Sequence, residues 1–187
     1  MSAVPPPPGG REDDEEQRGV GLPDAFARLY TPHRMAYIQG ESKPHGDGCP
    51  FCEIPALSDG DGLVVTRGQL AYAVLNLYPY NSGHVMLVPY RHVAGYDELT
   101  EPEAREIAAL TQHALRALRH VSGAQGFNVG MNLGVVGGAG IAAHLHQHVV
   151  PRWGGDTNFM PVVGGTRVLP QLLPKTRDLL ARAWDEV

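Results

Sequence analysis

Short apolar stretches, separated by turn-forming residues, predict a chain rich in β-strands. Residues 63–76 form two apolar runs interrupted at Arg67-Gly68, which predicts a β-hairpin. Residues 84–89 predict a strand that ends at Pro89, because proline cannot donate a hydrogen bond to a sheet. Two further strands are predicted at 127–133 and 144–151, and a glycine-rich loop at 134–140 lies between them.

The strongest helix signal covers residues 101–121. Pro102 stands in the first turn and Gly123 follows the last apolar position, as is typical of the two ends of a helix. Acidic residues favour the N-terminal end and an apolar stripe runs along one face: Glu101, Glu103 and Glu106, then Ile107, Leu110, Leu115 and Leu118. A second helix is predicted at 170–185. Several strands with one long helix and one terminal helix predict an α+β fold.

The first residues of the chain differ in composition from the rest. Residues 1–21 contain four consecutive prolines and an acidic run from Glu12 to Glu16. They have too few apolar side chains to form a core, so we expect a disordered tail. Residues 22–38 are more apolar and predict a short helix or an arm. With 187 residues in the chain, we expect a single domain over 22–187.

Charge and hydropathy exclude several functional classes. The formal net charge of −5 argues against a protein that binds a nucleic-acid polymer through bulk positive charge. No apolar run approaches the roughly 20 residues that span a bilayer, so we expect no membrane partner. The first residues lack the apolar centre of a secretory signal, which favours a cytoplasmic location.

The main chemical signal is a group of three closely spaced histidines, His144, His146 and His148. In a strand, residues two apart point to the same face, so the three rings would share one face. Buried imidazoles need hydrogen-bond partners, which makes a purely structural role the least favoured interpretation. A metal site and a nucleophile with acid–base helpers remain. No acidic residue stands near the three histidines before Asp156, which weakens the interpretation as a metal site. A neutral imidazole is suited to attack on phosphorus, which supports the interpretation as a nucleophile.

Cys49 and Cys52 have the spacing of a zinc knuckle. Two free reduced thiols and a redox pair are the alternatives, although a redox C-x-x-C motif needs a βαβ context that the chain does not predict. His45 precedes the pair closely and is one choice of further ligand. A zinc ion here would be structural, and we expect no metal in the catalytic step.

The run from His144 to Val150 resembles the His-φ-His-φ-His-φ-φ signature of the histidine triad (HIT) superfamily, in which φ is apolar; Gln147 interrupts it. Further blocks resemble that family in the same order, and the resemblance covers about 49–155: Leu75-Asn76, Gly83 to Pro89, and Arg91-His92. The segments 30–38 and 144–159 resemble the actinobacterial branch that includes diadenosine tetraphosphate (Ap4A) phosphorylases. This resemblance implies a mostly antiparallel five-stranded sheet with one long helix and a C-terminal helix.

The resemblance also implies roles for individual residues. His146 would attack the α-phosphorus of a nucleotide and form a nucleotidyl-histidine, His148 would contact the same phosphate, and His144 would support the strand. The other expected contacts with substrate are Asn76 at the ribose, His84 behind the nucleophile, Asn132 and Gly140 at the phosphates, and Trp153 at the nucleotide. Some bacterial members complete a zinc site with the residues that match His92 and His144, so we expect Cys49, Cys52, His92 and His144 as ligands.

One departure from the family pattern bears on the reaction. Many HIT hydrolases carry Gln and Ser or Thr at the positions of Gly140 and Ile141. Main-chain N–H groups of residues 137–140 would have to replace those donors. This favours phosphorolysis, in which inorganic phosphate converts Ap4A to ATP and ADP, over hydrolysis or phosphoramidase activity. A nucleotide-binding sensor is the alternative from another class, and the resemblance implies a homodimer or homotetramer.

Overall fold

The computed structural model describes residues 48–156 and 171–187, which all belong to one compact unit, Pro32–Val187. The tail predicted at 1–21, the helix or arm predicted at 22–38, and His45 lie outside the described residues. The division into a tail and one domain therefore stays a prediction. In the part described, no helix is long and apolar enough to cross a membrane.

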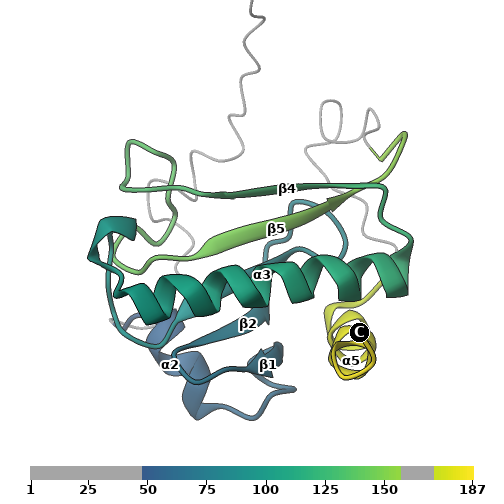
Figure 1. Cartoon of the computed structure of the whole chain (residues 1–187), viewed down its shortest axis with the longest axis horizontal. Coiled ribbons are helices and arrows are strands. Elements are labelled where there is room, and N and C mark those ends of the chain that lie inside the picture. Colours follow the sequence, from purple (N-terminus) through teal and green to yellow (C-terminus); the bar gives the residue numbers. More distant parts are fainter. Residues whose placement is uncertain (1–47, 157–170) are drawn as a thin grey trace, which may run out of the picture. The chain divides into compact units, whose positions relative to one another are not determined.

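Five strands form one antiparallel sheet in the order β1-β2-β3-β5-β4, with helices packed against it (Figure 1). The strands are β1 (Val64–Arg67), β2 (Ala71–Leu75), β3 (Val85–Pro89), β4 (Gly126–Met131) and β5 (Gln147–Arg152). The main helices are α3 (Glu101–Ser122) and α5 (Leu173–Trp184), and shorter ones are α2 (Pro50–Glu53), η3 (Ile54–Ala56) and η4 (Tyr96–Glu98). The predicted α+β fold with a five-stranded antiparallel sheet is confirmed.

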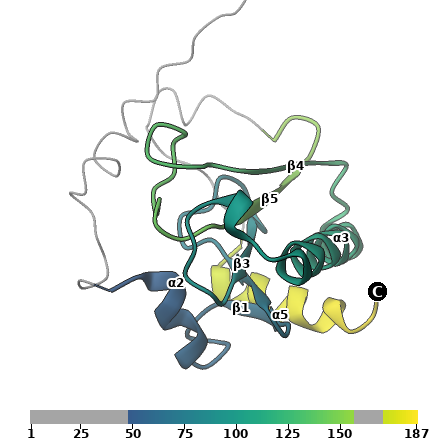
Figure 2. The same cartoon turned by 60° about the vertical axis from the view of Figure 1, so that its left-hand side comes forward.

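The central strands are buried on both faces because side chains alternate between two cores. On one face, Leu87 and Val149 pack with Leu118 of α3 and Leu180 of α5. Figure 2 shows α3 and α5 side by side next to this sheet, with α2 away from them. The other core contains Phe51 of α2 and the alternate side chains of the strands, namely Val64, Tyr72, Val74, Met86 and Val88. The histidines belong to this second face.

Local signals explain where α3 begins and ends. The Thr100 hydroxyl accepts a hydrogen bond from the Glu103 amide, and the Glu103 carboxylate accepts one from the Thr100 amide. At the other end, Gly123 adopts φ +60°, which glycine reaches without steric cost. These two ends lie within a residue or so of the predicted ones. Glu106 has an additional role, because its carboxylate accepts the main-chain N–H groups of Gln69 and Leu70 in the β1–β2 hairpin.

The strand predicted at 144–151 begins later, at Gln147. The β3–β5 ladder pairs Leu87 with Gln147 and goes no further toward His144. Pro89, at the end of β3, has no N–H to extend the ladder. The amide of Leu145 instead donates to the carbonyl of Val93 at 2.6 Å. The prediction that all three histidines lie on a strand was therefore wrong for His144 and His146.

Candidate functional site

The three histidines still lie together, although only His148 is part of β5. His144, His146 and His148 are all buried, with exposed fractions of 0%, 6% and 9%. The rings of His146 and His148 are 4.9 Å apart, centroid to centroid, and nearly perpendicular. Gln147 points the other way, and its amide donates to the Thr111 hydroxyl of α3. The alternation predicted from the sequence thus places the imidazoles on one side of the segment.

The protonation pattern of His146 follows from its partner. Its Nδ1 lies 2.8 Å from the main-chain oxygen of His144, and a carbonyl oxygen only accepts, so Nδ1 carries the proton. In the neutral ring the lone pair is then on Nε2. Burial lowers the pKa of His146, although the bond to the His144 carbonyl acts in the opposite direction. The ring is therefore neutral near pH 7, with Nε2 as its nucleophilic atom.

His84 contacts His148. Nδ1 of His84 accepts the main-chain N–H of Tyr80 at 3.0 Å, so the proton of a neutral His84 ring is on Nε2. This Nε2 lies 2.9 Å from Nδ1 of His148. Donation along this bond leaves Nε2 of His148 as its proton-bearing nitrogen, ready to donate to an anion. His84 is fully buried, and this hydrogen bond connects it to His148.

Asn76 lies at the same end of the site, at the exit of β2. Its amide nitrogen is 3.3 Å from Nδ1 of His84, and its side-chain oxygen accepts the N–H of Tyr78. The main chains of Asn76 and His84 are also hydrogen-bonded, at 2.9 Å. The structure thus brings Asn76 next to the histidines, as the sequence suggested, while a contact with ribose stays a prediction.

Two aromatic side chains in contact with the histidines were missed by the sequence analysis. The ring of Phe51 lies 4.9 Å from that of His146 and 5.5 Å from that of His144. The ring of Tyr80 lies 4.7 Å from that of His84 and 5.6 Å from that of His148. Phe51 stands inside the Cys49–Cys52 motif, and this position is the one sequence feature that could have indicated its role.

The glycine-rich loop offers fewer main-chain donors than expected. The amides of Gly138 and Ala139 donate to the carbonyls of Val135 and Gly134 within the loop itself. Of the four residues expected to supply N–H groups, these two are thus already committed. Gly140 is exposed, and the half-buried Asn132 follows β4 directly. Since Met131 pairs with Gln147, Asn132 lies close to the beginning of β5.

Trp153 is grouped with the helices and not with the histidines. Its indole N–H donates to the carbonyl of Ser122 at the end of α3. Together with Leu118 and Leu180, its side chain borders a cavity on the helix-covered side of the sheet. The expected contact between Trp153 and a nucleotide stays a prediction.

A second cluster lies next to the histidines and has the composition of a metal site. One donor atom from each of Cys49, Cys52, His92 and His144 lies within 4.8 Å of all the others. The Sγ atoms of Cys49 and Cys52 are 3.4 and 3.5 Å from Nδ1 of His144, and Sγ of Cys52 is 3.2 Å from Nδ1 of His92. The structure thus brings together the four ligands that were expected.

The chemistry of this cluster fits zinc. Zn–S bonds of about 2.3 Å and Zn–N bonds of about 2.05 Å at a tetrahedral angle separate sulfur and nitrogen by about 3.6 Å, which is close to the observed distances. His144 donates from Nε2 to the carbonyl of Pro89 at 2.9 Å, which leaves the lone pair on Nδ1, the atom that faces the cysteines. A carbonyl partner of this kind orients metal-binding histidines. A Cys₂His₂ set is a common structural zinc site.

The chain is similar to known proteins that share the histidine triad signature or the HIT domain. A family model described as HIT domain matches residues 59–155. Over 173 residues the chain is 54% identical to a Mycobacterium tuberculosis protein named AP-4-A phosphorylase, and the match covers 89% of each chain. An asymmetrical bis(5'-nucleosyl)-tetraphosphatase from Schizosaccharomyces pombe is 31% identical over 93 residues, half of each chain. The crystal structure of a zinc-bound histidine triad family protein from Mycobacterium smegmatis superposes with a TM-score of 0.59 at 25% identity, over 74% of this chain and 94% of that one.

Proposed function

Because the chain belongs to the HIT domain family, we propose that it transfers an adenylyl group from Ap4A to inorganic phosphate, which yields ATP and ADP. The similarity to the AP-4-A phosphorylase supports the substrate and the acceptor. The observation that carries the chemistry is the hydrogen bond from His146 Nδ1 to the His144 carbonyl, because it leaves a nucleophilic Nε2 on a neutral ring.

In the first step, Nε2 of His146 forms a bond to the α-phosphorus next to one adenosine, and this AMP unit stays on the ring. The bond from this phosphorus to its bridging oxygen breaks, and the rest of the molecule, which holds three phosphates and the second adenosine, leaves as ATP. The ring becomes cationic while its adenylyl group is attached, and the His144 carbonyl stabilises the Nδ1 proton. The Nε2 proton of His148, set by His84, is suited to donate to an oxygen of the same phosphate.

In the second step, an oxygen of inorganic phosphate attacks the adenylyl-histidine, and the P–N bond breaks to release ADP and the free ring. Water at the same position would release AMP. The acceptor thus decides between a phosphorylase and a hydrolase, and the product identity reports it directly.

Labelled phosphate distinguishes these reactions. The purified protein is incubated with Ap4A and ¹⁸O-labelled phosphate, and the nucleotides are separated and analysed by mass spectrometry. The proposal expects label in ADP and none in ATP, and little turnover when phosphate is omitted. AMP and ATP formed at the same rate without phosphate would contradict phosphorolysis and support a hydrolase.

We also propose that zinc occupies the cluster of Cys49, Cys52, His92 and His144. Bound there, the ion would supply structural cross-linking of α2, the segment after β3, and the first histidine of the triad. His146 and His148 are not ligands in this arrangement, so this ion would act on the fold and not through the two catalytic rings.

We infer further that the protein works as a homodimer or homotetramer in the cytoplasm. β4 is at one end of the strand order, and Val129 at its centre is 47% exposed, so this edge suits pairing with a second copy. Reduced cysteines and a nucleotide substrate are typical of the cytoplasm. Light scattering at several protein concentrations tests the assembly, and a monomer at all of them would contradict it.

A further inference from the structure

The segment that follows β3 supports both the metal cluster and the histidine segment. The carbonyl of Pro89 accepts the Nε2 proton of His144, and the carbonyl of Val93 accepts the amide of Leu145. Between them, His92 lies with Nδ1 3.2 Å from Sγ of Cys52. A shift of this short segment would therefore displace one proposed ligand and change the orientation of another.

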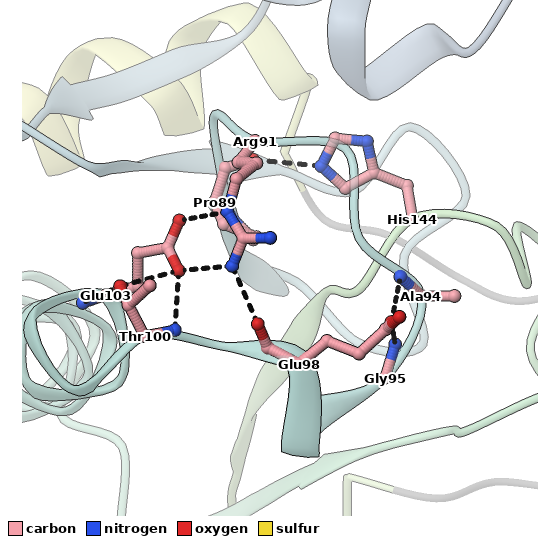
Figure 3. Close-up of polar contacts among 8 residues, drawn as sticks. All are labelled: Pro89, Arg91, Ala94, Gly95, Glu98, Thr100, Glu103 and His144. Atoms are coloured by element: carbon pink, nitrogen blue, oxygen red, sulfur yellow. Dashed lines mark hydrogen bonds and ion pairs between the residues drawn. The ribbon is translucent and has the colours of Figure 1, made fainter.

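Arg91, at the centre of this segment, connects it to α3 (Figure 3). Its Nε donates to Oε1 of Glu103 at 2.9 Å and its Nη2 donates to Oε2 at 2.7 Å, which is a bidentate ion pair. Nη2 also donates to the carbonyl of Glu98 at 2.7 Å. The Arg91 side chain is half-exposed, but the Glu103 side chain is only 6% exposed.

Glu103 is held firmly by its own helix. Both the amide and the hydroxyl of Thr100 donate to its Oε2, at 2.8 Å each. Glu98 restrains the far part of the segment in a similar way, because its carboxylate accepts the amides of Ala94 and Gly95 (Figure 3). The segment is thus attached to the beginning of α3, which is itself packed on the sheet.

We propose that Arg91 and Glu103 are positioning residues for the metal site: their bidentate pair fixes the main chain around Arg91, so that His92 is held beside Cys52 and Pro89 orients the ring of His144. Neither residue is a ligand, and neither touches the reacting atoms. The inference rests on the zinc site proposed above and adds the prediction that metal affinity depends on an ion pair outside the coordination sphere.

The planar guanidinium is necessary for this geometry. A lysine could donate to one carboxylate oxygen, but it could not also hold the other oxygen and the Glu98 carbonyl in one plane. On the same helix, Arg105 and Glu101 provide a matched comparison. They form an ion pair of the same chemical type, but both side chains are exposed, at 74% and 83%, and face solvent.

The test measures zinc affinity by competition with a chromophoric chelator under reducing conditions. Arg91→Gln should weaken zinc binding about 10- to 100-fold, which is the usual cost of losing a group that orients a ligand. Arg91→Lys should fall between this variant and the wild type, and it keeps the test usable should Arg91→Gln fold poorly. Arg105→Gln should bind zinc as the wild type does.

A double-mutant cycle separates positioning from general destabilisation. His92→Ala removes the ligand next to Arg91, so adding Arg91→Gln to it should weaken zinc binding by clearly less than it does in the wild type. Co²⁺ gives a second readout, because the visible bands of the Arg91→Gln complex should shift toward those of the His92→Ala complex.

The outcomes distinguish this inference from the zinc proposal. A wild-type protein that binds no zinc would overturn the metal site and the positioning role together. A wild-type protein that binds zinc, with Arg91→Gln and Arg91→Lys binding as tightly as Arg105→Gln, would overturn the positioning role alone. Full additivity of Arg91→Gln and His92→Ala would also overturn it.

Discussion

The main-chain oxygen of His144 accepts the Nδ1 proton of His146, while the ring of His144 directs its own Nδ1 at the two cysteines. One residue thus belongs to both clusters, through its carbonyl in one and its ring in the other. Because the ring is anchored on its far side by Pro89, the carbonyl that orients the proposed nucleophile is held from two directions. The metal cluster and the histidines therefore share a structural support.

Zinc should stabilise the fold without being required for chemistry. We expect one zinc per chain, and a free zinc concentration one hundred times the Kd should raise the free energy of unfolding by about 2.7 kcal/mol. Thermal unfolding of the chelated and zinc-loaded protein measures this, and the double variant Cys49→Ser/Cys52→Ser serves as the control that should not respond. Below the unfolding temperature the chelated protein should retain turnover. Complete loss of turnover in a folded, zinc-free protein would contradict the account.

Removing His84 should reduce catalysis through His148. His84→Ala leaves Nδ1 of His148 without the donor that sets its tautomer, so kcat should fall by about a hundredfold with little change in KM. In a protein that already carries His148→Ala, the same substitution should cost almost nothing more. His120→Ala is the control, because His120 pairs with Glu186 at the surface. Equal losses in both backgrounds would show that His84 acts elsewhere.

Gln147 should be replaceable only together with its partner. Thr111→Val leaves the partly buried Gln147 amide without its acceptor, which should destabilise the protein by about 1–3 kcal/mol. Adding Gln147→Leu, which restores the apolar position of the family signature, should recover most of this loss. Urea unfolding of the two single variants and the double variant measures these changes. A double variant as unstable as the sum of the singles would contradict the pairing.

Particular residues show how far the sequence could predict this structure. The helix over 101–121 and the first four strands were indicated by local periodicity, and the alternation of His144, His146 and His148 predicted their shared side. The prediction that this strand begins at His144 was wrong, because the observed beginning of β5 depends on Pro89, which lies far away in the sequence. The pairing of Arg91 with Glu103 also depends on tertiary packing, and no local pattern indicates it. The contacts of Phe51 with the triad depend on packing too, and the position of Phe51 between the two cysteines is the only local signal for them.

The Arg91–Glu103 pair should make stability depend on pH in acid. Hydrogen bonds from Arg91, supported by Thr100 and opposed by burial, lower the pKa of Glu103 from 4.5 to about 2. The stabilisation is therefore complete above about pH 4.5 and is lost as the pH falls toward about 2. Urea unfolding of the chelated protein across this range should show a smaller decline for Glu103→Gln than for the wild type. Identical declines would contradict a lowered pKa for Glu103.

Trapping the covalent intermediate tests the central claim that His146 Nε2 carries the adenylyl group. Wild-type protein is mixed with Ap4A in the absence of phosphate, quenched in alkali, where a P–N bond survives, and digested for mass spectrometry. We predict one adenylyl group on His146, its rapid conversion to ADP when phosphate is added, and a loss of turnover on the order of a thousandfold or more in a folded His146→Ala protein that still binds nucleotide. Two results would contradict the account. One is a wild-type protein that forms ATP and ADP steadily with phosphate but shows no adduct on His146 without it, and the other is steady formation of ATP and ADP by His146→Ala.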